Sequence, residues 1–406
     1  MLKILYFFIF PILLLYPYGI LDGIYLNYGY IIFVFLCFIF FDKNKISLKF
    51  NNNFFLSLFL VIIIADFVSL QISPVQSTFN YFASSFRFLI YFLIATILIS
   101  TTKNIQDLKF WLRSYFVAYS LSLLIIILDS FKIPLIGLLF RVTSFKDLNT
   151  LDIYYRAYGS YLSPISAGTF IVNSMIIILP LFTSNIKLSK SLKALAFFLI
   201  IVSIVSLMAT ASRTAIVALF ALFVFLAMTS KHRFKFLFLF FLIVTILINI
   251  EFIKPFIDNI YLRTARNTNF NQSLLEGSGR LDTYKNSLRL FFDARTYFFG
   301  VGPAEYSKGD ENFSYAHNGF LTIILCYGFI GMGLFIYIIK KLFKSIKSIT
   351  INPLKSYAVK YFWYFLTVNA VMFITSDGPV THFWLIYFVF FSYLFFAFSN
   401  VAYQKI

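Results

Sequence analysis

Three residues in this chain have the chemistry needed to bind an anion and to move a proton: Arg213, Arg280 and His317. Each lies beside the expected start of a helix, where backbone N–H groups and the helix dipole attract negative charge. A guanidinium at such a position binds phosphate through paired hydrogen bonds. We therefore expect the two arginines to contact an anion, although a snorkelling arginine at a membrane interface has the same surroundings.

His317 directly precedes Asn318 and a hydrophobic segment. A helix N-terminus and neighbouring arginines both disfavour imidazolium, so His317 is expected to be neutral and able to accept a proton. The sequence thus favours a general base or a substrate contact here. A structural or capping histidine is the alternative.

Further candidates for substrate binding lie in other polar positions. Arg156 lies in a loop, Asn318 follows the histidine, and His382 flanks the last expected turn. Arg87 lies within an apolar segment at a depth that matches Asp66, which predicts an ion pair because lone charges are costly in a membrane. Contact of Arg87 with a lipid phosphate is the alternative.

A short amphipathic helix is expected after Ser278, on the membrane surface. Its polar face offers Arg289 as another anion contact, and Gly300-Val301-Gly302-Pro303 is expected to be the turn that returns the chain to the membrane. The expected apolar face contains Leu281, Tyr284, Leu288 and Phe291, and the polar face contains Asp282, Lys285, Asn286 and Arg289. Ser212 is expected to cap the helix that begins at Arg213.

The elements that must position these residues are membrane helices. The chain has 406 residues, of which 60% are hydrophobic and 12% charged, which predicts an all-α, polytopic membrane bundle forming a single domain, 1–406. About twelve apolar segments are long enough to cross a bilayer. They lie near 3–20, 24–41, 54–71, 79–99, 109–129, 162–184, 192–209, 212–230, 234–250, 318–340, 357–376 and 380–401.

The net charge of +18 does not indicate a nucleic-acid partner, because most lysines lie in short gaps between apolar segments. The positive-inside rule then places both termini in the cytoplasm. It also places two longer loops outside, 130–161 and the larger 251–317, which carries short interfacial helices. The first apolar segment is expected to be a retained helix rather than a signal peptide.

Cofactors and metals are not expected. Cys37 and Cys326 both lie in apolar segments, which argues against a disulfide or a cysteine metal site. The outer acidic residues lack calcium-loop spacing, so only a loose divalent site stays open.

The order of these motifs resembles the O-antigen ligase/polymerase superfamily of bacterial envelope proteins. The resemblance covers roughly 200–345, and Arg289 with Gly300 resembles the Arg-x10-Gly spacing of polymerase loops. The motifs are Ser212-Arg213-Thr214, Gly279-Arg280-Leu281-Asp282, Gly300-Val301-Gly302, His317-Asn318-Gly319-Phe320-Leu321 and Tyr327-Gly328-Phe329-Ile330-Gly331.

The resemblance implies an inverting, metal-independent glycosyltransferase on the periplasmic face of the bacterial inner membrane, acting in lipopolysaccharide or surface-polysaccharide biosynthesis. The donor would be an oligosaccharide on undecaprenyl pyrophosphate. Arg213 and Arg280 would hold the pyrophosphate and stabilise it as it leaves, and His317 would activate the acceptor hydroxyl. A chain-length regulator and a flippase of the same pathway are the implied protein partners.

Three functions are compatible with these residues. We favour an O-antigen polymerase, which adds the glycan to the next lipid-linked repeat unit. An O-antigen ligase would use lipid A–core as its acceptor. A flippase for the same lipid-linked glycan is disfavoured, because it predicts internal repeats and ionisable residues deep in several spans.

Overall fold

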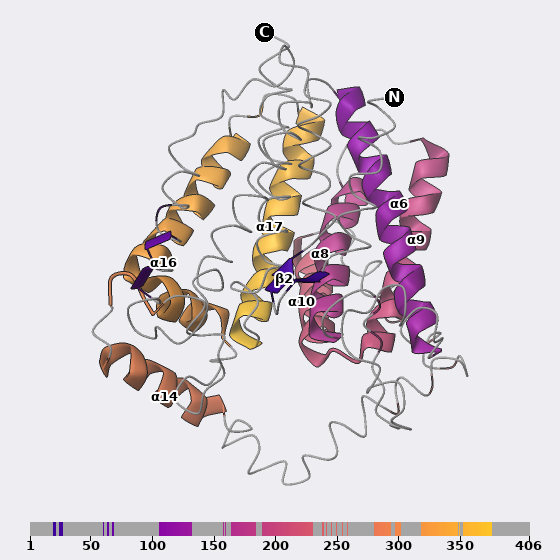
Figure 1. Cartoon of the computed structure of the whole chain (residues 1–406). Helices are drawn as coiled ribbons and strands as arrows, with labels where there is room; N and C mark the ends of the chain where they lie inside the picture. Colours follow the sequence, from indigo (N-terminus) through magenta and orange to yellow (C-terminus); the bar gives the residue numbers. More distant parts are fainter. Residues whose placement is uncertain are drawn as a thin grey trace. The chain divides into compact units, whose positions relative to one another are not determined.

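The computed structural model describes residues 19–21, 24–26, 60, 63, 64, 67, 68, 105–131, 157, 159, 164–183, 189–229, 238, 241, 245, 249, 254, 258, 280–293, 297–301, 318–347, 349 and 352–375. Its elements in chain order (Figure 1) are β1 (Gly19–Leu21), β2 (Ile24–Leu26), α6 (Ile105–Ser130), α8 (Pro164–Thr183), α9 (Lys190–Thr210), α10 (Arg213–Thr229), α14 (Arg280–Asp293), α16 (Gly319–Lys347) and α17 (Asn352–Thr375).

Five of the described helices are long and apolar enough to cross a membrane: α6, α8, α9, α16 and α17. Helix α10 is a shorter apolar helix. These six coincide with six of the expected spans, and the chain is therefore a multi-pass membrane protein. The other expected spans lie largely outside the described residues, and the side of the membrane that each end faces stays a prediction.

The sequence predicted an all-α fold, and this prediction was wrong at residues 19–26. Strands β1 and β2 pair antiparallel there, with Gly19 opposite Leu26 and Leu21 opposite Ile24. The two residues between the strands are Asp22 and Gly23, a sequence that favours the tight turn of a hairpin.

The chain divides into two compact units. Unit 1 comprises Met1–Phe33, Lys109–Thr268 and Ile351–Met372, and unit 2 comprises Val34–Leu108, Asn269–Thr350 and Phe373–Ile406. Unit 1 therefore holds α8, α9 and α10 with most of α6 and α17, whereas unit 2 holds α14 and α16.

Helix α8 is the central helix of unit 1. Every residue from Phe170 to Leu181 is buried, and α9 and α10 both pack against it. Buried hydroxyl groups add polar contacts: Tyr115 of α6 lies 2.6 Å (Oη to Oγ) from Ser174 of α8, and Tyr119 lies 2.6 Å from Ser203 of α9. Such contacts join helices in lipid, where apolar surfaces alone give no preference for a neighbouring helix.

Helix α17 is joined to α8 in the same manner. Asn369 Nδ2 donates to Asn173 Oδ1 at 3.1 Å, and Tyr357 Oη donates to Ile177 O at 2.8 Å. The second contact falls in the turn that contains Pro180, a residue without the N–H that continues a helical ladder. Tyr357 thus donates to the carbonyl next to that of Ile176, which is the one that Pro180 leaves without its helical donor.

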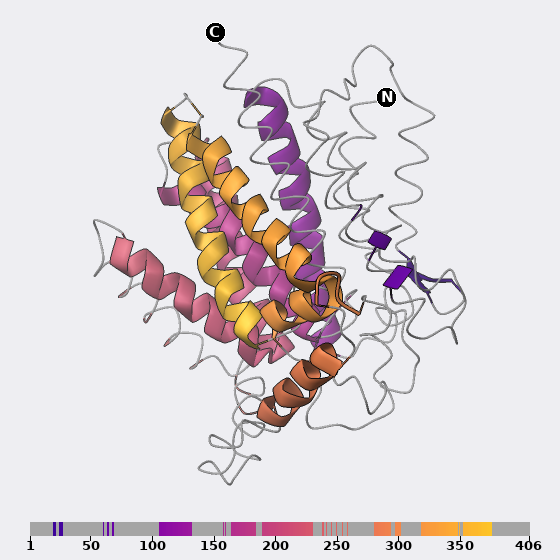
Figure 2. The same cartoon turned by 90° about the vertical axis from the view of Figure 1, so that its left-hand side faces the viewer.

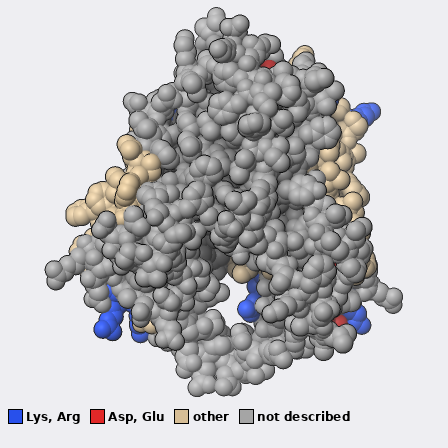
Figure 3. Space-filling model, in the orientation of Figure 1, with Lys and Arg blue, Asp and Glu red and all other residues tan. Residues whose placement is uncertain are grey.

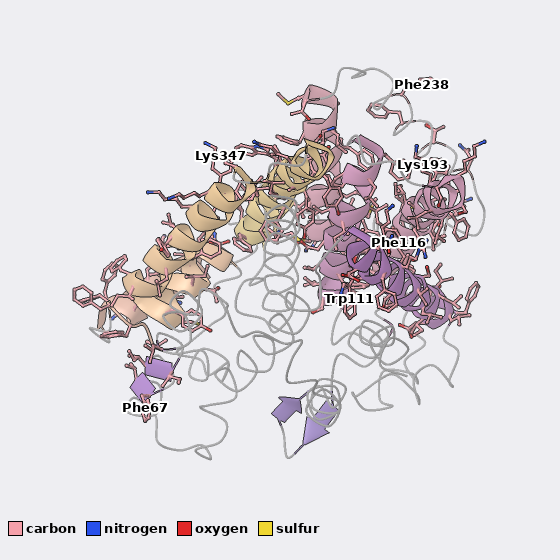
Figure 4. The ribbon with its side chains drawn as sticks, turned by 90° about the horizontal axis from the view of Figure 1, so that it is seen from above. Phe67, Trp111, Phe116, Lys193, Phe238 and Lys347 are labelled. Carbon is pink, nitrogen blue, oxygen red and sulfur yellow. The ribbon has the colours of Figure 1, made fainter. Side chains whose placement is uncertain are left out.

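The outward surfaces of unit 1 are apolar, as expected for helices in lipid. Val117, Leu121 and Leu124 are exposed at helical spacing along α6, whereas Trp111 and Phe116 of the same helix are buried. Seen from above, Phe116 lies among the helices of the unit, whereas Lys193, near the start of α9, lies at its edge (Figure 4).

In unit 2, α14 lies beside the first half of α16 (Figures 1 and 2). Phe291 is 1% exposed and packs with Leu325 and Cys326 of α16. The described side chains of α14 confirm the expected faces: Tyr284 and Leu288 are half-buried and Phe291 is buried, whereas the polar side chains are exposed. This apolar face packs against protein, at least along its second half.

Helix α16 is not continuous. Gly328 has φ 65° and ψ −167°, which splits α16 into segments 319–327 and 329–347. This backbone conformation is accessible to glycine and to essentially no other residue. The span that the sequence predicted near 318–340 is confirmed, and the break within it is a feature that the sequence did not predict.

Candidate active site

Arg213 begins α10 directly after a tight turn from α9. Ala211 has φ 46° and donates its N–H to Met208 O at 2.9 Å, which ends α9 in a left-handed cap. The Thr210 hydroxyl accepts the N–H of Ser212 at 3.3 Å. The turn places the Arg213 guanidinium on the first residue of an apolar helix, where it is exposed.

Ser212 was expected to cap α10 with its hydroxyl, and this was wrong. Ser212 Oγ is buried and has no hydrogen-bond partner, although the Ser212 carbonyl accepts the N–H of Ile216 at 3.0 Å. The reason is its neighbour in α8: a Cβ placed on Gly168 would lie 3.0 Å from Ser212 Oγ. The hydroxyl is therefore enclosed by α8 and turned away from the free N–H groups of its own helix.

Gly168 lets α8 approach the start of α10 closely. A Cβ at this position would lie 2.8 Å from the Cβ atoms of both Ala215 and Ser212. Small residues permit this approach between membrane helices. The start of α10, and with it the Cα of Arg213, is therefore held by the largely buried helix of unit 1.

The segment that follows Arg156 lies at the same end of unit 1. Ala157 N donates to Ala209 O at 3.1 Å, and Gly159 N donates to Asp129 Oδ2 at 2.9 Å. Asp129 is 2% exposed and lies at the end of α6. Unit 1 thus brings the loop of Arg156 to the turn that precedes Arg213, although the Arg156 side chain lies outside the described residues.

Arg213 also lies at one end of an exposed apolar stripe along α10. Val217 and Phe220 are 52% and 51% exposed, Val224 is 36% exposed and Met228 is 72% exposed. The steps of four, three, four and four residues keep all five side chains on one face of the helix. The guanidinium therefore shares the face of α10 that meets lipid.

In unit 2, the polar face of α14 presents basic groups to solvent. Lys285, Asn286 and Arg289 are exposed, and basic side chains gather over α14 in Figure 3. Arg280 is the first residue of this helix, as the sequence predicted, and its side chain lies outside the described part.

Asn318 caps α16. Its Oδ1 accepts the N–H groups of Phe320 and Leu321, each at 3.1 Å, and its carbonyl accepts the N–H of Thr322 at 2.9 Å. This gives the Asn318 amide a structural role in addition to the substrate contact predicted for it. The cap fixes the residue that directly follows His317.

The remaining predicted positions, Arg87, His317 and His382, lie outside the described residues, as does the expected pair of Asp66 with Arg87. Arg213 and Asn318 each begin a helix as predicted, in separate units.

Residues 196–336 match the model of the O-antigen ligase family. The chain carries an O-antigen ligase domain. The domain extends from α9 into α16, so it includes Arg213, Arg280 and His317. This match agrees with the resemblance to the O-antigen ligase/polymerase superfamily of membrane glycosyltransferases that the sequence motifs predicted over roughly 200–345. No curated protein matches the chain.

Several residues that shape the O-antigen ligase domain and its surroundings had no assigned role at the level of sequence. Gly168, Asp129 and Thr210 all support the start of α10 or the segment beside it. The run of small residues Ser166-Ala167-Gly168-Thr169 was the available signal for close helix packing. Gly328 had no such signal, because glycine is common in membrane helices that continue through it.

Proposed function

We propose that the O-antigen ligase domain polymerises lipid-linked repeat units of a bacterial surface polysaccharide on the periplasmic face of the inner membrane. The donor is a growing glycan on undecaprenyl pyrophosphate, and the acceptor is a sugar hydroxyl of the next lipid-linked repeat unit. The other parts of this pathway, a flippase and a chain-length regulator, are its expected partners.

The setting of Arg213 carries this proposal. An exposed guanidinium at the end of a lipid-facing stripe can meet the phosphates of a lipid whose tail stays in hydrocarbon. The helix dipole at the start of α10 favours the same anion. A soluble substrate would not need a binding group on this face of the helix.

In the proposed reaction, Arg213 and Arg280 bind the pyrophosphate, and His317 accepts a proton. The acceptor hydroxyl oxygen forms a bond to the anomeric carbon from the face opposite the leaving group. The bond from that carbon to the pyrophosphate oxygen breaks, the pyrophosphate leaves with the electron pair, and the hydroxyl proton passes to His317. Guanidinium groups stabilise the charge that grows on the leaving oxygen.

The roles of the arginines are tested by Arg213→Lys and Arg280→Ala, each scored for long-chain polysaccharide and for protein content in the membrane. Both variants should insert normally and lose chain elongation. Arg280→Ala removes the guanidinium, whereas Arg213→Lys keeps the charge but loses the bidentate hydrogen bonds. Lys285→Ala is the matched control, since Lys285 is exposed on the polar face of α14 and has no proposed contact with substrate. Normal polysaccharide in either arginine variant removes the pyrophosphate assignment.

A ligase is the second candidate, and the match of residues 196–336 to the O-antigen ligase family favours it. The two functions are separated by the lipopolysaccharide of a deletion strain. A core that carries a single repeat unit indicates a polymerase. Bare core with accumulating lipid-linked polymer indicates a ligase, and it would replace the first proposal.

A further inference from the structure

The break in α16 at Gly328 is crossed by another part of the chain. The backbone of residues 297–301 runs along the break and hydrogen-bonds to both halves of the helix. Val301 N donates to Leu325 O at 2.7 Å on the first half. On the second half, Phe329 N donates to Tyr297 O at 2.8 Å and Ile330 N donates to Phe298 O at 3.1 Å.

These bonds satisfy backbone groups that a break leaves without helical partners. The first N–H groups of 329–347 and the last carbonyls of 319–327 have no partner within their own segments. In a membrane such groups must be satisfied by the protein, because lipid offers no hydrogen bonds. The crossing segment therefore belongs to the fold of α16.

Two glycines make the crossing possible. A Cβ at Gly328 would lie 2.2 Å from Phe298 O, and a Cβ at Gly300 would lie 2.4 Å from the carbonyl carbon of Cys326. Both neighbours are backbone atoms, so no side chain can move aside. Gly300 also has φ 75°, a conformation that other residues rarely adopt.

The crossing connects two elements that carry proposed substrate contacts. Helix α14 begins at Arg280 and packs its Phe291 on Leu325 and Cys326, beside the break. Segment 319–327 begins directly after Asn318 and His317. Phe291 also contacts Tyr297 and Phe329, with ring centroids 5.7 and 5.8 Å apart, so its ring touches the crossing segment and both sides of the break.

We propose that the crossing built on Gly300 and Gly328 is a positioning device, which fixes α14 relative to the start of α16 so that glycan transfer can occur. Gly300 and Gly328 are positioning residues in this scheme and do not touch substrate. The inference rests on the proposed function for its effect on activity, whereas its structural part stands on the hydrogen bonds alone.

The structural part is tested first in the unmodified full-length protein in nanodiscs, by hydrogen–deuterium exchange of peptides that cover 297–301 and 328–330. The amides of Val301, Phe329 and Ile330 should exchange slowly, like amides within a helix. Exchange as fast as that of an open loop would overturn the crossing, and this measurement requires no variant to fold.

The positioning role is tested with Gly328→Ala, with Gly333→Ala as the control in the same helix. A Cβ at Gly333 has nothing within 4 Å, and Gly333 keeps helical geometry. Spin labels at Lys285→Cys and Lys344→Cys, in a background without Cys37 and Cys326, report the distance from α14 to the second half of α16. Both labelled lysines are exposed.

Gly328→Ala should broaden or shift this distance and lower transfer by about 100-fold, a loss that a misplacement of about 1 Å can cause. Gly333→Ala should change neither. An unchanged distance in Gly328→Ala, or a changed distance with full transfer activity, would overturn the positioning role. Neither result bears on the arginine assignments, which fail only if Arg213→Lys or Arg280→Ala retains elongation.

Discussion

The close contact between α8 and the start of α10 predicts a measurable defect in Gly168→Ala. A new Cβ would lie 2.8 Å from two carbon atoms, the Cβ atoms of Ser212 and Ala215. Non-bonded carbons rest about 3.5–4.0 Å apart, so the helices must separate by roughly 0.7–1.2 Å. Arg213 begins α10 and would move with it.

The magnitude follows from two opposing effects. Overpacking a well-packed site costs about 1–3 kcal/mol. Replacing glycine by alanine within a helix contributes about 1 kcal/mol in the other direction. The free energy of unfolding should therefore fall by roughly 0–2 kcal/mol. Glycan transfer should fall by about 100-fold if Arg213 binds a phosphate, because the guanidinium would be displaced together with the start of α10.

The assay pairs two measurements on purified protein in mixed micelles. The free energy of unfolding is measured by titration with a denaturing detergent, and transfer is measured with a lipid-linked repeat unit. Gly333→Ala is the control, because its new Cβ meets no atom within 4 Å and should stabilise α16 by up to about 1 kcal/mol.

A Gly168→Ala variant that gains stability as Gly333→Ala does, and transfers glycan at the parent rate, would refute the reasoning about the α8–α10 contact. A further check is the double variant Gly168→Ala with Ala215→Gly. It removes one of the two closest carbons and should recover part of the lost activity, whereas a purely additive loss would contradict the assigned contact.

Three further predictions concern described hydrogen bonds. In the same detergent titration, Asp129→Ala should destabilise the protein by about 1–3 kcal/mol, because the buried Gly159 N–H loses its acceptor. Asp129→Asn keeps an acceptor oxygen and should destabilise the protein less. A double-mutant cycle on Asn173 and Asn369 should give a coupling of about 0.6 kcal/mol; zero coupling would deny the bond between α8 and α17. Asn318→Ala should destabilise α16 by about 1 kcal/mol through loss of its cap, and Asn318→Ser should restore most of that stability; equal losses in the two variants would exclude the capping role.

The sequence allowed the six described apolar helices to be predicted because the length and composition of a membrane span are dictated by the bilayer. Helix α14 was predictable for a related reason: Tyr284, Leu288 and Phe291 recur at helical spacing, and this is the side that the structure buries or half-buries. The starts of α10 and α16 followed from polar residues next to apolar segments.

The errors and the missed break share a physical cause, which is that backbone geometry depends on partners distant in sequence. Gly328 breaks α16 because residues 297–301 satisfy the freed backbone groups, and no local pattern records that pairing. The Ser212 hydroxyl does not cap its helix because α8 approaches through Gly168. Only the hairpin at 19–26 had a local signal, Asp22-Gly23, which the surrounding apolar residues masked.

The apolar stretch of α10 is short for a membrane span. Its residues from Ala215 to Met228 are all apolar. Arg213 and Thr214 precede this stretch, and the polar residues Thr229-Ser230-Lys231 follow it. At about 1.5 Å per residue, the 17 residues of α10 measure about 26 Å, against a hydrocarbon core of about 30 Å. Thinning of the bilayer around the helix is one of the ways in which a membrane accommodates such a short span. Thinning at this end of α10 would lower the lipid headgroups next to Arg213, and with them the phosphates of the lipid carrier in the proposed function.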